Sequence, residues 1–206
     1  MLSVNALECV RGERRLFSGV NFELKPQTLL EVRGANGSGK TSLLRLLCGL
    51  LAPASGCIAW NGGDIHASGE EYRAQFAYIG HLNAVKDELT GLENLLFSAR
   101  IAGLVCNAAS ADQALHELGL SDFRHLPCKV LSQGQRRRVA LARLYLSAAR
   151  PLWILDEPFA ALDSAACELV RARLESHLQQ GGMVVLSTHH DIAISARSTQ
   201  RLELGQ

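Results

Sequence analysis

The sequence predicts an α/β protein that has a mostly parallel sheet as its core and a helical subdomain inserted into that sheet. Apolar segments that favour strands alternate with helical segments, which is typical of a parallel sheet covered on both faces. The middle of the chain is mainly helical. Because 206 residues suffice for one sizeable core, we expect a single domain over 1–206, with 1–81 and 151–206 as the core and 82–150 as the subdomain.

The first half of the chain alternates between strand and helix patterns. Strands are expected at 20–24 and 28–33, and the second is apolar and β-branched up to a glycine-rich loop. Residues 40–51 change to helical spacing, with leucines on one broad face. Short apolar segments at 57–60 and 76–79 predict two further strands.

Helices dominate the region that follows. A T-x-x-E capping box predicts a helix over 91–102, and the similar pattern that begins at Ser110 predicts a second helix over 111–118. A third helix is expected over 134–149, and Pro151 marks its end.

The last part of the chain returns to strands. WILD at 153–156 and MVVLS at 183–187 are continuous apolar segments, typical of buried strands. A helix that begins after Ser164 and ends near the glycine pair at 181–182 is expected to join them. Residues 200–204 predict a last strand.

Composition excludes several classes of protein. Hydrophobic residues make up 48% and charged residues 20%, as in ordinary soluble domains, and the net charge of +1 gives no sign of binding to nucleic acid or to an anionic membrane surface. The N-terminus lacks the pattern of a signal peptide, and glycines and a proline interrupt the longest uncharged stretch, 46–63. We therefore expect any membrane-spanning part to belong to another chain.

Cysteine spacing gives no metal or heme site. The sequence contains no C-x-x-C pair, no C-x-x-C-H heme attachment motif and no His at metal spacing from a Cys. We expect the six cysteines to be small buried side chains in a reducing compartment: Cys9, Cys48, Cys57, Cys106, Cys128 and Cys167.

A glycine-rich loop with the sequence GANGSGKT, residues 34–41, lies between a predicted strand and a predicted helix. Its glycines let successive N–H groups converge on an anion, and the start of the helix adds its positive dipole end. Lys40 is expected to reach the β- and γ-phosphates of a nucleotide, and the Thr41 hydroxyl to bind Mg²⁺. The expected nucleotide contacts are Gly34, Asn36, Gly37, Ser38, Gly39, Lys40, Thr41 and Ser42.

Two acidic residues end the predicted strand in LWILDEP, residues 152–158. Ligands of open α/β sheets bind at the carboxyl ends of the strands, so Asp156 is expected in the Mg²⁺ shell. Glu157 points to the other side of the strand and is the candidate base that orients and deprotonates the attacking water. A solvated turn is the alternative, and the phosphate loop disfavours it.

A histidine pair follows the next buried strand, in STHHD at 187–191. His189 is our candidate to hydrogen-bond the γ-phosphate, because it lies nearer the strand end; His190 is the competing choice. Metal binding by the pair is disfavoured, since no third ligand is evident.

A second glycine loop, LSQGQ at 131–135, also runs into a helix. Taken alone, these residues indicate an ordinary helix cap followed by a solvated arginine run, 136–138. The run gives little support for nucleic-acid binding in a nearly neutral chain.

Taken together, GANGSGKT, LSQGQ, LWILDEP, AALD at 160–163 and STHH, in this order, resemble the ATP-binding subunits of ATP-binding-cassette (ABC) transporters over essentially the whole chain. The resemblance implies an ATPase of the P-loop NTPase fold, with Lys40, Glu157 and His189 as catalytic residues. It also implies that LSQGQ is the signature loop.

In this family the signature loop binds the γ-phosphate of the ATP held by another subunit. The resemblance therefore implies a head-to-tail pair of copies that encloses two nucleotides. Ser132, Gly134 and Gln135 would contact the partner's ATP, and Asp163 would lie along the seam between the copies. A glycine allows close backbone approach, and the helix start favours negative charge.

Three positions depart from the common pattern of the family. Gln133 replaces the usual glycine of the signature loop. Arg11 stands where an aromatic residue usually stacks on adenine; its guanidinium can also stack, although it can equally be a solvated surface residue. His81 stands at the usual glutamine position, which puts a metal contact there in doubt and leaves the role of His81 open.

The stretches 13–24, 78–95 and 135–163 resemble the heme-exporter branch of the family, which serves bacterial cytochrome c maturation. This implies a peripheral protein on the cytoplasmic face of the inner membrane, bound to integral-membrane subunits. ATP would drive a heme-delivery step, either release of a heme-loaded chaperone or heme export, without heme binding by this chain. A transporter for another cargo, a soluble iron–sulfur assembly ATPase and a module that only holds ATP are the alternatives.

Overall fold

The computed structural model describes residues 1–189 and 193–205, and these residues form two compact units. The sheet unit comprises Met1–Tyr78, Arg150–Glu157 and Glu175–Gln206; the helical unit comprises Ile79–Ala149 and Pro158–Leu174. Residues 158–174 group with the helices, although the sequence places 151–206 in the core.

The sheet unit contains a four-stranded antiparallel sheet with the order β2-β1-β4-β5. Its strands are β1 (Leu2–Arg11), β2 (Arg14–Leu24), β4 (Ser55–Trp60) and β5 (Gly63–Asp64). The sequence predicts no strand at β1, because the alternation of buried residues changes phase: the register shifts between Val4 and Leu7, and Ala6 has a φ of 46°. The sequence predicts a mostly parallel sheet and does not predict this separate antiparallel sheet.

The second sheet is five-stranded, and its order is β6-β7-β8-β3-β9. Its strands are β6 (Phe76–Ile79), β7 (Leu152–Asp156), β8 (Met183–Ser187), β3 (Thr28–Gly34) and β9 (Ser198–Leu204). The pairs β3–β8, β7–β8 and β3–β9 are parallel, which confirms the predicted parallel sheet. Every residue of β7 and β8 is buried, as their continuous apolar sequences predict.

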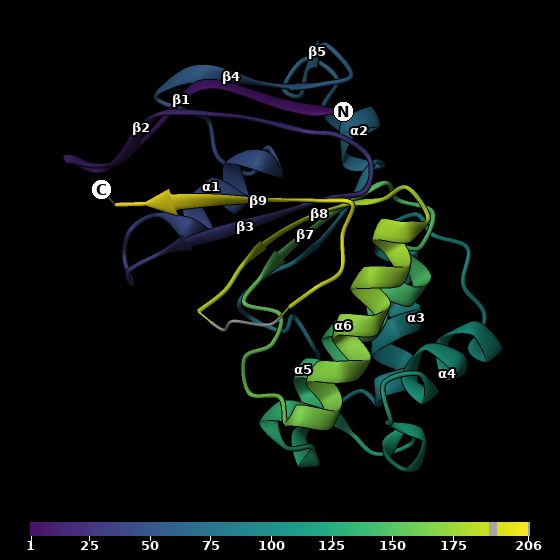
Figure 1. The fold of residues 1–206 in the computed structure, drawn as a ribbon. Helices are drawn as coiled ribbons and strands as arrows, with labels where there is room; N and C mark the ends of the chain where they lie inside the picture. The colour runs from purple at the N-terminus through teal and green to yellow at the C-terminus, as the bar shows by residue number, and fades with distance from the viewer. Residues whose placement is uncertain (190–192, 206) are drawn as a thin grey trace. The chain divides into compact units, whose positions relative to one another are not determined.

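Helix α1 (Lys40–Leu47) lies between the two sheets of this unit, as Figure 1 shows. Its leucines at 43, 44, 46 and 47 are fully buried and join residues of both sheets in one core. The helix begins at the expected residue but ends at Leu47 rather than near residue 51, because the chain turns at Gly49, where φ is 66°. A short helix, α2 (Gly69–Arg73), was not predicted.

The helical unit contains α3 (Gly91–Ile101), α4 (Ala108–His116), α5 (Gln133–Leu146) and most of α6 (Ser164–Gln179), with short 3₁₀ turns at Ser121–Phe123 and Cys128–Val130. A capping box opens α3 as predicted. The predicted start of α4 is wrong: Asn107, not Ser110, caps the helix, and Ser110 completes that capping box from within the first turn. In the described part of the chain, no helix combines the length and the apolar character that crossing a bilayer requires.

Asn94 is a buried hydrogen-bond centre that holds the loop before α3. Its side-chain amide donates to the carbonyls of Lys86 (3.0 Å) and Thr90 (3.0 Å), and its Oδ1 accepts from the Lys86 N–H (2.7 Å). The amide also donates to the Cys128 thiol (3.3 Å). This one side chain therefore satisfies several backbone groups of a segment that has no regular structure.

We expect Asn94→Ala to lower the free energy of unfolding by about 3 kcal/mol, because it leaves buried backbone groups without partners. Urea denaturation of the full chain measures this change. Gln113→Ala, which removes an exposed side chain bonded to Glu117, is the control and should change stability by less than about 0.5 kcal/mol. An Asn94→Ala protein as stable as the wild type would contradict the role of Asn94 as a stabilising hydrogen-bond centre.

Only part of the expectation for the cysteines is confirmed. Cys9, Cys48 and Cys128 are buried, whereas Cys57 is exposed and Cys106 and Cys167 are half-buried. All six are free thiols. The exposed and half-buried ones lie on strand β4 or near helix ends, where the sequence pattern alone does not determine exposure.

Candidate nucleotide site

The phosphate loop joins the end of β3 to the start of α1. Gly39 precedes the helix with a φ of 105°, a backbone conformation that side chains rarely adopt, and Gly37 has a φ of 80°. Lys40 is 7% exposed, and its ammonium group donates to the carbonyls of Gly34 (2.8 Å) and Ala35 (3.2 Å). These bonds stabilise the curled conformation of the loop. The positive charge of Lys40 inside it favours the binding of an anion.

Two segments that are distant in the sequence, β9 and β2, pack against the phosphate loop. A Cβ atom on Gly34 would overlap the backbone oxygen of Leu204 in β9 and would lie 2.6 Å from the Ser38 hydroxyl. A Cβ on Gly39 would lie 3.0 Å from the ring of Phe17 in β2. The glycines are thus needed for close packing as well as for their backbone angles. The Ser38 hydroxyl is buried without a hydrogen-bond partner in the described residues, so a polar site remains inside the loop.

We expect Gly34→Ala to weaken ATP binding by at least about tenfold, equivalent to 1.4 kcal/mol, because the loop must move away from Leu204. Fluorescent-nucleotide titration measures the affinity. Gly181→Ala provides the matched control, since Gly181 also has a positive φ (95°) but no atom within 4 Å of an added Cβ. The control should lose stability and keep its ATP affinity; an equal loss of affinity in both variants would contradict the role of the packing.

Asp156 lies at the carboxyl end of β7, beside the phosphate loop. It is 2% exposed, and its Oδ2 accepts from the Thr41 hydroxyl at 2.8 Å. Burial raises the pKa of the neighbouring Tyr78 phenol, and the Asp156 charge raises it further, so that hydroxyl stays protonated. The hydrogen bond between Thr41 and Asp156 thus brings the two residues that are expected to hold a metal into contact.

The separation of these two oxygens fits a magnesium ion. Neighbouring ligands in an octahedral shell with Mg–O distances of 2.0–2.1 Å lie about 2.9 Å apart. The Thr41 and Asp156 oxygens are 2.8 Å apart, and both are hard oxygen donors of the kind that Mg²⁺ prefers. The residues present therefore fit the metal.

Glu157 and His189 meet at the same edge of the sheet. The Nε2 atom of His189 lies 3.3 Å from Oε1 of Glu157, and both side chains are partly exposed. Glu157 has a φ of 49°, so its backbone leaves the strand direction and its side chain does not follow the simple alternation of a strand. The competing residue, His190, lies outside the described residues.

The signature loop forms a helix start in the helical unit. Ser132 caps α5 in a capping box with Gln135: its hydroxyl accepts from the Gln135 N–H (3.2 Å), and the Gln135 side chain accepts from the Ser132 N–H (2.8 Å). A Cβ on Gly134 would lie 2.6 Å from the Ala161 carbonyl oxygen, so the loop packs directly against the segment before Asp163. An ordinary helix cap is thus present, as the residues alone indicate.

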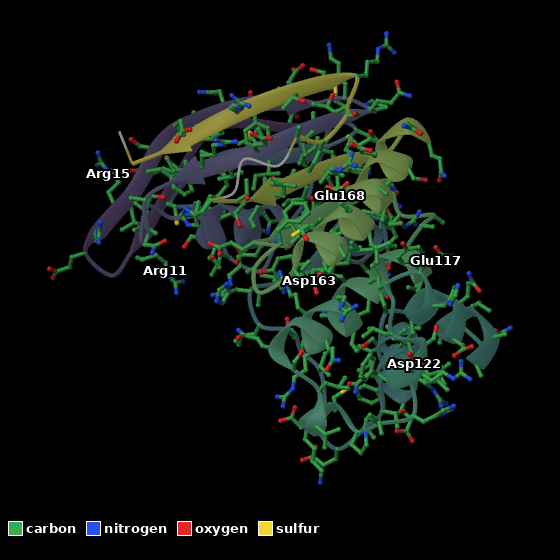
Figure 2. All side chains as sticks on the ribbon, turned by 60° about the horizontal axis from the view of Figure 1, so that its bottom comes forward. Arg11, Arg15, Glu117, Asp122, Asp163 and Glu168 are labelled. Atoms are coloured by element: carbon green, nitrogen blue, oxygen red, sulfur yellow. The ribbon has the colours of Figure 1, made fainter. Side chains whose placement is uncertain are left out.

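A small pocket of about 160 Å³ lies where these two segments meet. It is lined by residues of α5 and of the start of α6, among them Ser132, Gly134, Gln135 and Asp163. Asp163 caps α6 by accepting from the Ala166 N–H at 2.7 Å, and Figure 2 labels it at the start of that helix. Two helix starts therefore meet at this pocket. The Asp163 carboxylate already caps α6, so the start of α5 with the Gly134 N–H is the part that favours an anion.

The arginine run after the signature loop is only partly solvated, since Arg136 and Arg138 are half-buried and Arg137 is buried; this corrects the interpretation from the residues alone. Arg137 is 4% exposed and donates to the Gly80 carbonyl (2.9 Å), and Arg138 donates to the Leu118 carbonyl (3.1 Å). Arg136 pairs with Asp87 at 3.3 Å. The three side chains fix segments of the helical unit to α5, so their role here is structural.

The residues at the rim of the site are less defined. Arg11 is exposed at the end of β1 and projects from the β1–β2 hairpin (Figure 2), where a guanidinium can stack on a base. Asn36 is exposed as well, and Ser42 is half-buried in the first turn of α1. His81 belongs to the helical unit, where it is exposed. Burial raises the pKa of the Cys9 thiol, and contacts with Arg11 and the Ser42 hydroxyl partly oppose this shift.

Ser187, at the end of β8, belongs to the site although the sequence pattern did not reveal it. Its side chain bonds to Asp156 at 2.6 Å and accepts from the Glu157 N–H at 3.0 Å. The sequence does contain a signal for it: Ser187 is a polar residue at the end of an otherwise apolar strand, and it is the first residue of STHH.

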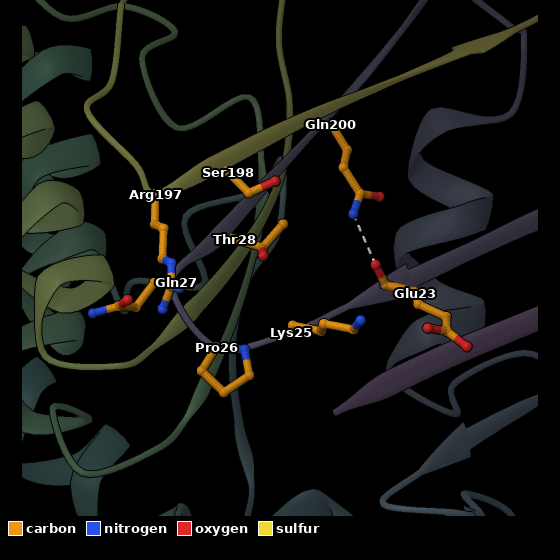
Figure 3. Close-up of a pocket in the computed structure, with 8 residues that line it drawn as sticks. All are labelled: Glu23, Lys25, Pro26, Gln27, Thr28, Arg197, Ser198 and Gln200. Atoms are coloured by element: carbon orange, nitrogen blue, oxygen red, sulfur yellow. Dashed lines mark hydrogen bonds between the residues drawn. The ribbon is translucent and has the colours of Figure 1, made fainter.

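A second, polar pocket of about 700 Å³ lies at the opposite ends of β3 and β9 and includes Lys25, Thr28 and Arg197 (Figure 3). It begins where β3 begins, whereas the phosphate loop follows the end of that strand. It is therefore separate from the nucleotide site.

Known proteins have sequences similar to that of this chain. The family model described as "ABC transporter" matches residues 17–160. A protein of Dechloromonas aromatica (strain RCB) called "Cytochrome c biogenesis ATP-binding export protein CcmA" is 53% identical over 205 residues and covers 100% of both chains. The protein of the same name from Nitrosospira multiformis is 52% identical over 96% of each chain.

Solved structures show the same fold. "Structure of ATP binding subunit of ABC transporter" has a TM-score of 0.81 at 29% identity and covers 91% of this chain and 79% of that one. "Dimeric structure of a post-hydrolysis state of the ATP-binding cassette MJ0796 bound to ADP and Pi" has a TM-score of 0.77 at 26% identity and covers 92% and 88%. With the phosphate loop and the two strand-end acids in place, this chain belongs to the family of ABC transporter ATP-binding subunits.

Proposed function

We propose that the chain is the ATP-binding and ATP-hydrolysing subunit of an ABC transporter complex that drives a heme-delivery step in cytochrome c biogenesis. The relatives match over 96% or more of the chain, and their names support the role in cytochrome c biogenesis. The observation that carries the ATPase role is the grouping of Thr41, Asp156, Glu157 and His189 at one edge of the sheet, next to the phosphate loop.

ATP binds with its phosphates in the curl of residues 34–41. Backbone N–H groups of the loop and of the first turn of α1 donate to the phosphate oxygens, including those of Asn36, Ser38 and Ser42. Lys40 exchanges its loop carbonyls for the β- and γ-phosphates. Arg11 stacks on the adenine at the rim.

Thr41 and Asp156 hold Mg²⁺, which neutralises charge on the β- and γ-phosphates when bound. Glu157 accepts a proton from the attacking water and orients it toward the γ-phosphate. His189, 3.3 Å from Glu157, donates a hydrogen bond to the γ-phosphate and so links the presence of that group to the position of the base.

A second copy of the chain completes each site. The Ser132 hydroxyl, the Gly134 N–H and Gln135 of one copy contact the γ-phosphate bound by the other, and Asp163 lies along the seam. The pocket of about 160 Å³ beside these residues supports this assignment. ATP then joins the two copies, because its γ-phosphate contacts both of them. Hydrolysis removes this shared group, and the copies separate.

Integral-membrane subunits of the cytochrome c maturation complex bind the chain on the cytoplasmic side of the bacterial inner membrane. The helical unit exposes large apolar side chains at Leu82, Phe97, Ile101, Val105 and Val130, and a partner that covers them would remove this apolar surface from water. Heme is handled by those partners, and neither heme nor nucleic acid binds to this chain. The single domain with its inserted helical part acts as one ATPase module.

Purification of the complex through a tag on this chain tests the proposal. We expect integral-membrane subunits to accompany it, and ATP hydrolysis to depend on Mg²⁺. Deletion of the gene should abolish holocytochrome c formation while heme synthesis continues. A membrane-free complex with iron–sulfur assembly proteins, or normal cytochrome c in the deletion strain, would overturn the assignment.

A further inference from the structure

Ser187 is the last residue of β8, and strand pairing fixes its position. It stands opposite Asp156 of β7 on one side and Val32 of β3 on the other. It is completely buried. A polar side chain in such a place must find partners within the protein.

Both partners of the Ser187 hydroxyl belong to the candidate site. The hydroxyl donates to Oδ1 of Asp156 at 2.6 Å and accepts from the backbone N–H of Glu157 at 3.0 Å. One small side chain therefore connects the carboxylate of one residue to the backbone of the next.

The first bond fixes the orientation of the Asp156 carboxylate. Oδ1 is held by Ser187, while Oδ2 accepts from Thr41 at 2.8 Å. With one oxygen tied on each side, the plane of the carboxylate cannot rotate freely. Oδ2 is thereby directed to the side on which Thr41 lies.

The second bond supports a strained backbone. Glu157 adopts a φ of 49°, which is uncommon for a residue with a side chain and is strained. The Ser187 oxygen holds the Glu157 N–H where this conformation puts it. Two residues further along the same chain, His189 contacts the Glu157 carboxylate at 3.3 Å.

We propose that Ser187 is a positioning residue for ATP hydrolysis, which aligns the Asp156 carboxylate for the metal and the Glu157 side chain for the attacking water. This inference rests on the proposed function. Because the two alignments share one hydroxyl, its removal disturbs metal use and turnover together. The nucleotide contacts of the phosphate loop do not involve Ser187 and remain.

Ser187→Ala in the purified full-chain complex tests the inference, with Ser187→Thr as the variant that keeps the hydroxyl. For Ser187→Ala we expect kcat to fall and the half-saturating Mg²⁺ concentration to rise, each by about tenfold or more, as for other partners that orient metal ligands. The ATP affinity measured without metal should stay within about twofold. Ser187→Thr should recover most of both changes.

Val184→Ala provides the control for lost packing, since Val184 is equally buried on the same strand and has an apolar side chain. It should lower the melting temperature and leave the Mg²⁺ dependence as in the wild type. If Ser187→Ala folds poorly, Ser187→Cys takes its place, since a thiol keeps the size of the side chain but is a weak hydrogen-bonding group. A wild-type Mg²⁺ dependence in the variant that lacks the hydroxyl, or an equal shift in Val184→Ala, overturns the inference.

The outcomes separate this inference from the proposed function. Wild-type kcat and Mg²⁺ dependence in Ser187→Ala, while Glu157→Gln is inactive, would refute the role of Ser187 alone. A wild-type complex without Mg²⁺-dependent ATP hydrolysis would refute the proposed function, and this inference with it.

Discussion

Glu157→Gln is expected to reduce steady-state ATP turnover by about 10²- to 10⁴-fold, the contribution of a well-placed general base. The amide has the size of the carboxylate but cannot accept a proton from water at neutral pH. Contact with His189, 3.3 Å away in the wild type, remains possible through the amide oxygen. ATP affinity should therefore stay close to that of the wild type, and a phosphate-release assay measures the loss of turnover.

The same variant should accumulate as an ATP-bound pair of copies. If the γ-phosphate joins the copies and is no longer removed, the pair cannot separate on the timescale of hydrolysis. Size-exclusion chromatography with ATP and Mg²⁺ should show a dimer for Glu157→Gln that is absent with ADP. Glu117→Gln, an identical change at an exposed position of the helical unit, should keep wild-type turnover. Undiminished hydrolysis in Glu157→Gln would exclude its role as the base.

Features carried by a short, continuous segment were predictable from the sequence. GANGSGKT has its geometry set by its own glycines, and β7 and β8 are apolar throughout, so their ends could be located. Since the carboxyl ends of parallel strands meet at one edge, the order of the motifs along the chain was enough to assign Asp156 and Glu157 to the phosphate loop.

Features that depend on contacts between distant segments were not predictable. The bond from Ser187 to Asp156 requires the register of β7 against β8, and the packing of Gly34 on Leu204 requires that of β3 against β9. The buried state of Arg137 depends on the Gly80 carbonyl, 57 residues away. Strand β1 escaped prediction for a different reason, because its bulges break the alternation of apolar residues.

Gly134→Ala should abolish ATP-dependent pairing and turnover while ATP still binds to each copy. An added Cβ would lie 2.6 Å from the Ala161 carbonyl oxygen, so the start of α5 must move away from the segment that carries Asp163. Gly91→Ala adds the same methyl group at the first residue of α3, where its nearest neighbour, the Leu115 side chain, is 3.4 Å away. This control should keep at least about half of the wild-type turnover, since the added methyl group makes an ordinary van der Waals contact with the Leu115 side chain and displaces no backbone.

Mixing Gly134→Ala with Lys40→Ala distinguishes a shared site from a site within one chain. Each variant alone has no complete site, but a mixed pair has one intact site, with Lys40 from one copy and Gly134 from the other. In equal amounts, about a quarter of the wild-type sites should return if pairing is random, and about half if only pairs with a complete site form, provided that the two copies are related by a two-fold axis. A mixture as inactive as its components, while cross-linking shows mixed pairs, would mean that the signature loop does not act on the partner's nucleotide.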